Sequence, residues 1–131
     1  MNNSITPAHY QKTTMQNEIE SWENQIDFIE KECAFYLKLI SLPEMQFDKT
    51  PVLKQALQKI SEANSELANR LLQNKNSLEG MIECDDLQCE TYYLDQHKET
   101  QDKIAQHEKA YREAKSSILK EEERLLGVKN S

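Results

Sequence analysis

The sequence predicts an all-α protein folded as an antiparallel up-down-up three-helix bundle with coiled-coil-like heptad packing. Apolar side chains between residues 15 and 40 recur in alternating steps of four and three, the pattern of a helix packed lengthwise on other helices. The 131 residues include only two glycines and three prolines, too few for the many turns of a sheet protein. Short segments around Pro43 and Cys84 separate three long helical patterns, and short connections make consecutive helices antiparallel.

The first helix is predicted over residues 13–42, after a flexible N-terminus over residues 1–12. Thr13 opens it, with Gln16 three residues on as the capping-box partner. Thr6-Pro7 offers an earlier start, with proline at the first helical position. Pro43 ends it, because proline disfavours helical backbone in the preceding residue. Its apolar stripe consists of Met15, Ile19, Trp22, Ile26, Ile29, Cys33, Tyr36 and Ile40.

The second helix is predicted over residues 51–82, with Thr50 as its N-cap and Gly80 near its end. Its stripe repeats the steps of the first and consists of Leu53, Leu57, Ile60, Asn64, Leu67, Leu71, Asn74, Leu78 and Met81. Two of these positions are asparagine. Asn64 either forms a buried polar layer that fixes the helix register or marks a place where the stripe opens to solvent.

The third helix is predicted over residues 85–126, with Asp85 as its N-cap and Gly127 as its stop. Its predicted stripe consists of Leu87, Leu94, His97, Ile104, Tyr111, Ile118 and Leu125. Polar residues occupy the alternate positions in this frame, namely Gln101, Glu108, Lys115 and Glu122. The third helix therefore covers the other two less completely than they cover each other.

The third helix exceeds its neighbours by about a dozen residues, or about 20 Å at the rise of an α-helix. The surplus carries Ile118, Leu119, Leu125 and Leu126. Two interpretations are open. The connector between the first two helices covers these side chains with Leu42, Met45 and Phe47, or a second protomer or a partner helix covers them.

Phe28 and Phe35 lie seven residues apart and one place off the first stripe. One interpretation is that they broaden the apolar face so that the first helix contacts two others. The alternative is a partner-binding ridge. The candidate interaction surface therefore consists of Phe28, Phe35, Ile118, Leu119, Leu125 and Leu126.

The formal net charge of −7 argues against nucleic acid and against an anionic membrane surface as partners. No apolar run approaches the length of a membrane span, and the N-terminus shows no secretory signal. The three cysteines, Cys33, Cys84 and Cys89, cannot all pair within one chain. We therefore expect free thiols and a cytoplasmic location.

The sequence assigns no catalytic, cofactor-binding or metal-binding residue, and we expect no cofactor and no enzyme activity. Cys84, Cys89 and His97 lie close together, but a structural zinc site usually needs a second cysteine pair. A ferritin-like di-metal centre needs glutamate three residues before histidine, and no histidine of the chain has one there. Cys33 lies on the apolar stripe, where burial makes a thiol inert.

Two stretches of the chain resemble a known group of proteins. Residues 18–42, with Glu-x-x-x-Trp and Ile-Asp-Phe-Ile, and residues 94–126, from Leu-Asp-Gln-His through Ile104 and Tyr111, resemble small uncharacterised three-helix proteins of Bacteroidetes. That resemblance covers roughly half of the chain. It implies a three-helix fold and no known activity.

We therefore expect a non-enzymatic helical-bundle protein that acts through protein–protein contacts, with another protein or as a homodimer. The first alternative is a small acidic chaperone or adaptor that holds a client helix in an apolar groove. The second is a metal-dependent helical-bundle enzyme that uses glutamate and histidine side chains between its helices.

Overall fold

The computed structural model describes residues 7–130, with side-chain surroundings given for residues 10–127. Three long helices make up most of it, α1 (Pro7–Leu39), α2 (Thr50–Ser77) and α3 (Leu87–Asn130). Two short 3-10 helices, η1 (Pro43–Met45) and η2 (Leu78–Glu83), lie in the connections. Because residues 7–130 contain no strand, the prediction of an all-α protein with three helices is confirmed.

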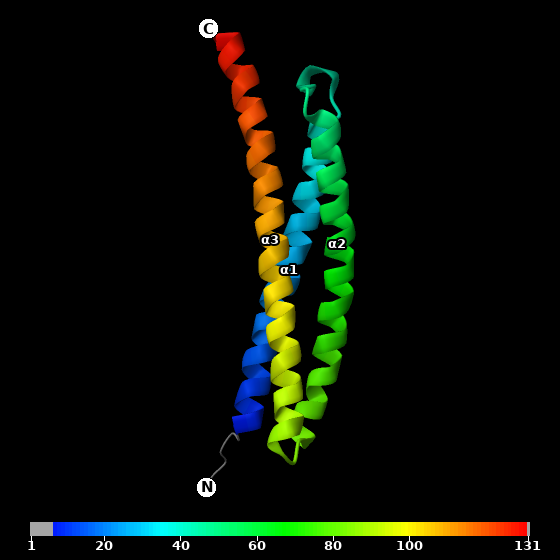
Figure 1. The fold of residues 1–131 in the computed structure, drawn as a ribbon, viewed down its shortest axis with the longest axis vertical. Coiled ribbons are helices and arrows are strands. Elements are labelled where there is room, and N and C mark those ends of the chain that lie inside the picture. The colour runs from blue at the N-terminus through cyan, green and yellow to red at the C-terminus, as the bar shows by residue number, and fades with distance from the viewer. Residues whose placement is uncertain (1–6, 131) are drawn as a thin grey trace.

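Figure 1 shows the three helices side by side along one long axis. The connection from α1 to α2 lies at one end of the molecule, and the connection from α2 to α3 lies at the other. α2 packs closely on both neighbours, whereas α1 and α3 approach each other closely at fewer positions. The last turns of α3 separate from the α1–α2 hairpin (Figure 1). The side of the bundle formed by α1 and α3 is therefore its least closely packed side.

All eight positions of the first stripe, seven in α1 and Ile40 directly after it, are buried, as the sequence predicts. The α2 positions are buried as well, apart from the half-buried Asn74. The core is divided into two apolar clusters. One gathers residues 29–40, 53–60 and 111–118, and the other gathers residues 15–26, 67–81 and Ile104. Asn64 and His107, both buried, occupy the level between them.

The predicted frame of α3 is wrong at alternate positions. The buried residues of α3 are Thr100, Ile104, His107, Tyr111, Ala114, Ile118 and Glu121. The chain was expected to bury Leu87 and Leu94, yet these side chains are 74% and 38% exposed. These buried positions recur in steps of four and three, but three of them carry polar side chains, and a frame chosen from apolar residues alone misses those three.

The ends of the helices also differ from the prediction. Residues 1–6 of the expected flexible N-terminus lie outside the described residues, and residues 7–12 belong to α1. Asp86, rather than Asp85, caps α3, because its carboxylate accepts a hydrogen bond of 2.8 Å from the Cys89 N–H. Gly127 does not stop α3. A glycine stops a helix through a positive φ, and no described glycine adopts one.

The connector is anchored by Thr50. Its hydroxyl accepts a hydrogen bond of 2.8 Å from the Phe47 N–H, so it holds the connector and does not cap α2. Gly80 has a packing role at the opposite end of the molecule. A Cβ atom there would collide with the Tyr93 hydroxyl of α3, so glycine leaves room for the present position of this ring.

Candidate interaction surface

Phe28 and Phe35 are exposed on α1. Their side chains are 57% and 59% exposed, so the interpretation that they pack against two helices of the bundle is wrong. Residues seven apart lie on the same side of a helix, and the two rings therefore form a ridge along α1. An exposed ring leaves most of its apolar surface in water, which a partner can remove.

A hollow of about 300 Å³ lies beside Phe28, between α1 and α3. It is lined by Gln25, Phe28, Ile29, Glu32, Glu108, Tyr111, Arg112 and Lys115. These residues together with Phe35 are called the α1–α3 face below. Since α1 and α3 are the less closely packed pair, the hollow is a place where the bundle leaves room for another side chain.

A hydrogen-bonded group of three side chains forms the floor of this hollow. The Tyr111 hydroxyl donates a hydrogen bond to the Glu32 carboxylate, and Lys115 Nζ lies 3.0 Å from the same oxygen. The Tyr111 bond is the main cause that lowers the pKa of Glu32, and Lys115 adds to it, against the opposing effect of burial. Burial, followed by the Glu32 bond, raises the pKa of Tyr111. The floor therefore holds a carboxylate, a neutral phenol and an ammonium group in fixed positions.

The overhang residues of α3 have different surroundings. Ile118 is fully buried in the first cluster, against which Phe47 of the connector packs. Leu125 is half-buried, whereas Leu119 and Leu126 are 43% and 59% exposed. Of the four predicted surface residues of α3, Ile118 is therefore part of the core. The connector covers the overhang only in part.

Glu121 is a buried residue that the sequence interpretation missed. Its side chain is 9% exposed, and its carboxylate lies 3.0 Å from Arg124 and 3.9 Å from Lys49. A hollow of about 300 Å³ opens beside it and is lined by Gln46, Phe47, Asp48, Lys49, Glu121, Arg124 and Leu125. The only signal in the sequence is its place three residues after Ile118 in the heptad.

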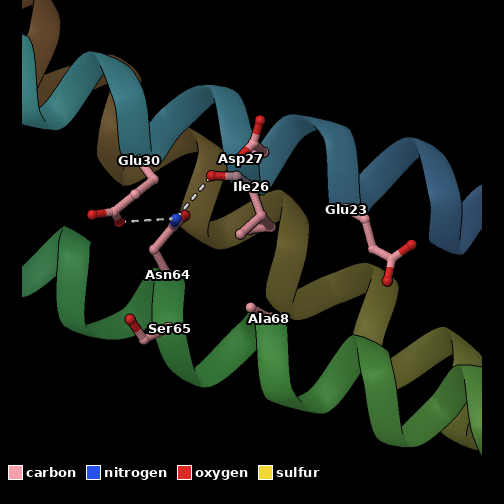
Figure 2. Close-up of a pocket in the computed structure, with 7 residues that line it drawn as sticks. All are labelled: Glu23, Ile26, Asp27, Glu30, Asn64, Ser65 and Ala68. Carbon is pink, nitrogen blue, oxygen red and sulfur yellow. Dashed lines mark hydrogen bonds between the residues drawn. The ribbon is translucent and has the colours of Figure 1, made fainter.

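A buried polar layer separates the two apolar clusters. Asn64 is 2% exposed, and its side-chain N–H groups donate to the backbone oxygen of Ile26 at 2.8 Å and to Glu30 at 3.3 Å. Figure 2 shows Asn64 reaching from α2 across to α1. Its carbonyl oxygen then faces His107 Nε2 at 2.8 Å, so His107 donates this bond. Burial lowers the pKa of His107, which favours the neutral imidazole.

The groove outside this layer is acidic. It has a volume of about 340 Å³, lies between α1 and α2, and contains the carboxylates of Glu23, Asp27 and Glu30 (Figure 2). Lys75 pairs with Glu23 at 3.4 Å, and Lys31 pairs with Asp27 at 3.0 Å. The groove therefore carries more negative than positive charge.

A second polar contact crosses from α2 to α3. Thr100 is fully buried, and its hydroxyl accepts hydrogen bonds from Arg70 at 2.8 Å and from Asn74 at 2.5 Å. Arg70 also pairs with Glu99 at 3.0 Å. Of the polar residues that the sequence placed on the stripes, Asn64 and Asn74 thus take part in polar contacts between helices, whereas Gln101 is exposed and Glu108 is half-buried.

The cysteines correct a prediction. Cys84 and Cys89 form a disulfide bond with a Cα–Cα distance of 5.5 Å, so the expectation of free thiols is wrong for this pair. Disulfides are typical of oxidising compartments, so the thiol-based argument for a cytoplasmic location is lost. Cys33 is free and buried, and burial raises the pKa of its thiol to about 11.

His97 also makes contacts within the bundle. Its Nε2 atom lies 2.8 Å from Glu18, and its ring lies against Trp22 with a centroid distance of 4.9 Å. Over the part of the chain that the structure describes, no three histidine, cysteine or acidic side chains converge in a way that could hold a metal ion.

Comparison with protein-family models, with curated proteins and with solved structures gave no match to this chain. None of the helices in residues 7–130 combines the length and the apolar character of a membrane span. The function therefore has to be inferred from the surfaces of the chain itself. Among these, the α1–α3 face combines exposed aromatic rings, a hollow and fixed polar groups.

Proposed function

We propose that this chain is a non-enzymatic, antiparallel up-down-up helical bundle with heptad packing that binds a protein through its α1–α3 face. The exposed rings of Phe28 and Phe35 carry this proposal. Phe28 lines the hollow at Tyr111, and Phe35 offers apolar area seven residues further along α1. Exposed aromatic residues dominate the energy of many protein interfaces.

The shape of the α1–α3 face suits a helical partner. α1 and α3 approach each other closely at few positions, and residues of the α1–α3 face repeat every seven positions, with Phe28 and Phe35 on α1 and Glu108 and Lys115 on α3. A helix that lies along such a groove places its own side chains between these residues at the same spacing. Binding would therefore complete the packing of the bundle's most open side.

A second candidate function is an adaptor that holds a client helix. The hollow beside Phe28 favours it, because that hollow can accept one large apolar side chain of a client. The same face would be used. The difference lies in the occupant, which is an exchangeable client helix in one case and a dedicated protein partner in the other.

Site-directed photo-cross-linking tests the proposed function. A photoreactive phenylalanine analogue replaces Phe28 in the full chain, expressed in its natural host and irradiated there. Leu72, which is 53% exposed on α2, provides the matched control position. We expect discrete protein adducts from position 28 and none from position 72. Equal or absent adducts at both positions would contradict a protein-binding role for this face.

A further inference from the structure

We infer that the partner of the α1–α3 face is a second copy of this chain, docked antiparallel across a two-fold axis perpendicular to the helices. This inference rests on the proposed function and specifies the partner. It is carried by the positions of four side chains, the exposed rings of Phe28 and Phe35 and the half-buried, charged Glu108 and Lys115, relative to one fixed level of the bundle.

The hydrogen bond between Tyr111 and Glu32 fixes that level. It places residue 32 of α1 beside residue 111 of α3, and both helices run in the same direction from there. Phe28 and Phe35 lie on either side of Glu32, four residues before it and three after it. Glu108 and Lys115 lie on either side of Tyr111 in the same way, three residues before and four after. The midpoints of the two pairs therefore lie within about one residue of each other along the bundle, or about 1.5 Å.

A two-fold axis through this level makes the face complementary to itself. The axis lies in the plane of contact and reverses the second copy, so that α1 meets α1 and α3 meets α3. Phe28 of each copy then meets Phe35 of the other. Glu108 of each copy approaches Lys115 of the other and extends the pairs that these side chains make within their own chain, Glu108 with Arg112 and Lys115 with Glu32. Two aromatic contacts and two opposite-charge contacts then form together.

The parallel alternative is not complementary. A two-fold axis along the helices would bring α1 of one copy onto α3 of the other at equal levels. Phe28 would then face Glu108 of the second copy, and Phe35 would face Lys115. The negative face of the Phe28 ring would repel the Glu108 carboxylate and remove water from it, and only the contact of Phe35 with Lys115 would be attractive, as a cation–π contact. The positions therefore favour the antiparallel arrangement.

The charge balance of the face also permits self-association. Two chains with a formal charge of −7 each repel one another, so they can meet only where local charges balance. The α1–α3 hollow is lined by two acidic and two basic residues, Glu32, Glu108, Arg112 and Lys115. Arg112 lies nearest the two-fold axis on α3, so the Arg112 side chains of the two copies come close to each other. Each pairs with Glu108 of its own chain at 3.2 Å, and this carboxylate offsets the repulsion between the two guanidinium groups.

The size of the face indicates a reversible dimer. Each exposed ring offers roughly 100 Å² of apolar area, so the four rings of a dimer contribute roughly 400 Å². A stable interface buries roughly 1,200 Å² or more, so the rings supply only about a third of that area. We therefore expect a dimer whose dissociation constant lies in the micromolar range, so that its population follows protein concentration.

Charge exchange tests the arrangement by analytical ultracentrifugation of the full chain over a concentration series. Glu108→Lys brings two lysines together at each charge contact, and Lys115→Glu brings two glutamates together, so each variant should self-associate at least about tenfold more weakly. An equimolar mixture of the two variants restores both opposite-charge contacts in a heterodimer. We expect the mixture to dimerise with an affinity near that of the unchanged chain. Glu66→Lys, an exposed change of equal charge on α2, is the control and should leave the dimer unaltered.

Several results would overturn the inference. A mass that stays at that of one chain throughout the concentration series would do so, as would a dimer that mixing does not restore or that Glu66→Lys weakens equally. Where Lys115→Glu does not fold, Phe28→Ser, which alters only an exposed ring, takes its place and should weaken the dimer at least about tenfold. A monomeric chain that still forms cross-links at position 28 would retain the proposed function and refute only the choice of partner.

Discussion

The buried layer of Asn64 and His107 makes a quantitative prediction about stability. Asn64→Leu leaves the His107 N–H without an acceptor in a site that is 7% exposed. An unsatisfied buried polar group costs about 1–3 kcal/mol, and the added apolar volume offsets part of this cost. We expect Asn64→Leu to lower the free energy of unfolding by about 2 kcal/mol. His107→Leu should cost about the same, because it leaves the Asn64 carbonyl oxygen unpaired.

The double variant is the decisive case. With both residues replaced by leucine, neither partner is left unpaired, and the two apolar clusters above and below become continuous. Replacing both partners of a buried polar pair is often close to neutral. The double variant should therefore lie within about 1 kcal/mol of the unchanged chain, which corresponds to a coupling energy of about 3 kcal/mol.

Urea-induced unfolding, followed by circular dichroism at pH 7.5, measures all four chains of this cycle. The slope of free energy against urea should stay constant, which shows that the compared states are the same. If the single changes add, so that the double variant loses about 4 kcal/mol, the pair does not act as a unit. The reasoning from the 2.8 Å bond between His107 and Asn64 would then be refuted.

Three further predictions concern pH, the disulfide and the floor of the hollow. Burial lowers the pKa of His107, so the stability that its neutral form contributes is complete above the unfolded-state pKa of 6.5 and is lost as pH falls through the lower folded value. Urea titrations at pH 7.5, 6.5 and 5.5 should show this loss of unfolding free energy, and His107→Gln should reduce the loss; an equal loss in both chains would contradict the role given to His107. Cys89→Ser opens a small loop and should cost about 2 kcal/mol, with faster hydrogen exchange confined to η2 and the first turn of α3; protection equal to that of the unchanged chain would count against it. Tyr111→Phe removes the bond to Glu32 and should cost about 1–2 kcal/mol in thermal unfolding, whereas the exposed Tyr92→Phe should cost less than about 0.5 kcal/mol; equal costs would argue against the bond.

The sequence predicted best where burial follows apolar character. Every stripe residue of α1 is apolar, so the period alone located its buried side. α3 failed for the opposite reason. Thr100, His107 and Glu121 are buried because partners on α2, on the connector or on α3 itself satisfy them, and a single sequence does not reveal such partners. The predicted frame therefore included Leu87 and Leu94, which are exposed, in place of these buried polar residues.

The site was predictable only in part. Phe28 and Phe35 were identified as a candidate ridge from their spacing, but their exposure depends on how far α3 stands from α1, which the sequence does not specify. The pairing of Cys84 with Cys89 depends on the geometry of the corner between η2 and α3, and the odd cysteine count gave no hint of it. The resemblance to three-helix proteins of Bacteroidetes stays a prediction.

Fluorine NMR tests the protein-binding role of the α1–α3 face most directly. The chain contains three phenylalanines, so uniform labelling with fluorophenylalanine gives one signal each for Phe28, Phe35 and Phe47. Phe47 packs against the core at the connector and serves as the internal control. On addition of host lysate or on a rise in protein concentration, the signals of Phe28 and Phe35 should shift or broaden while that of Phe47 stays unchanged. Signals of Phe28 and Phe35 that remain unaltered under both conditions would contradict the proposed interaction surface.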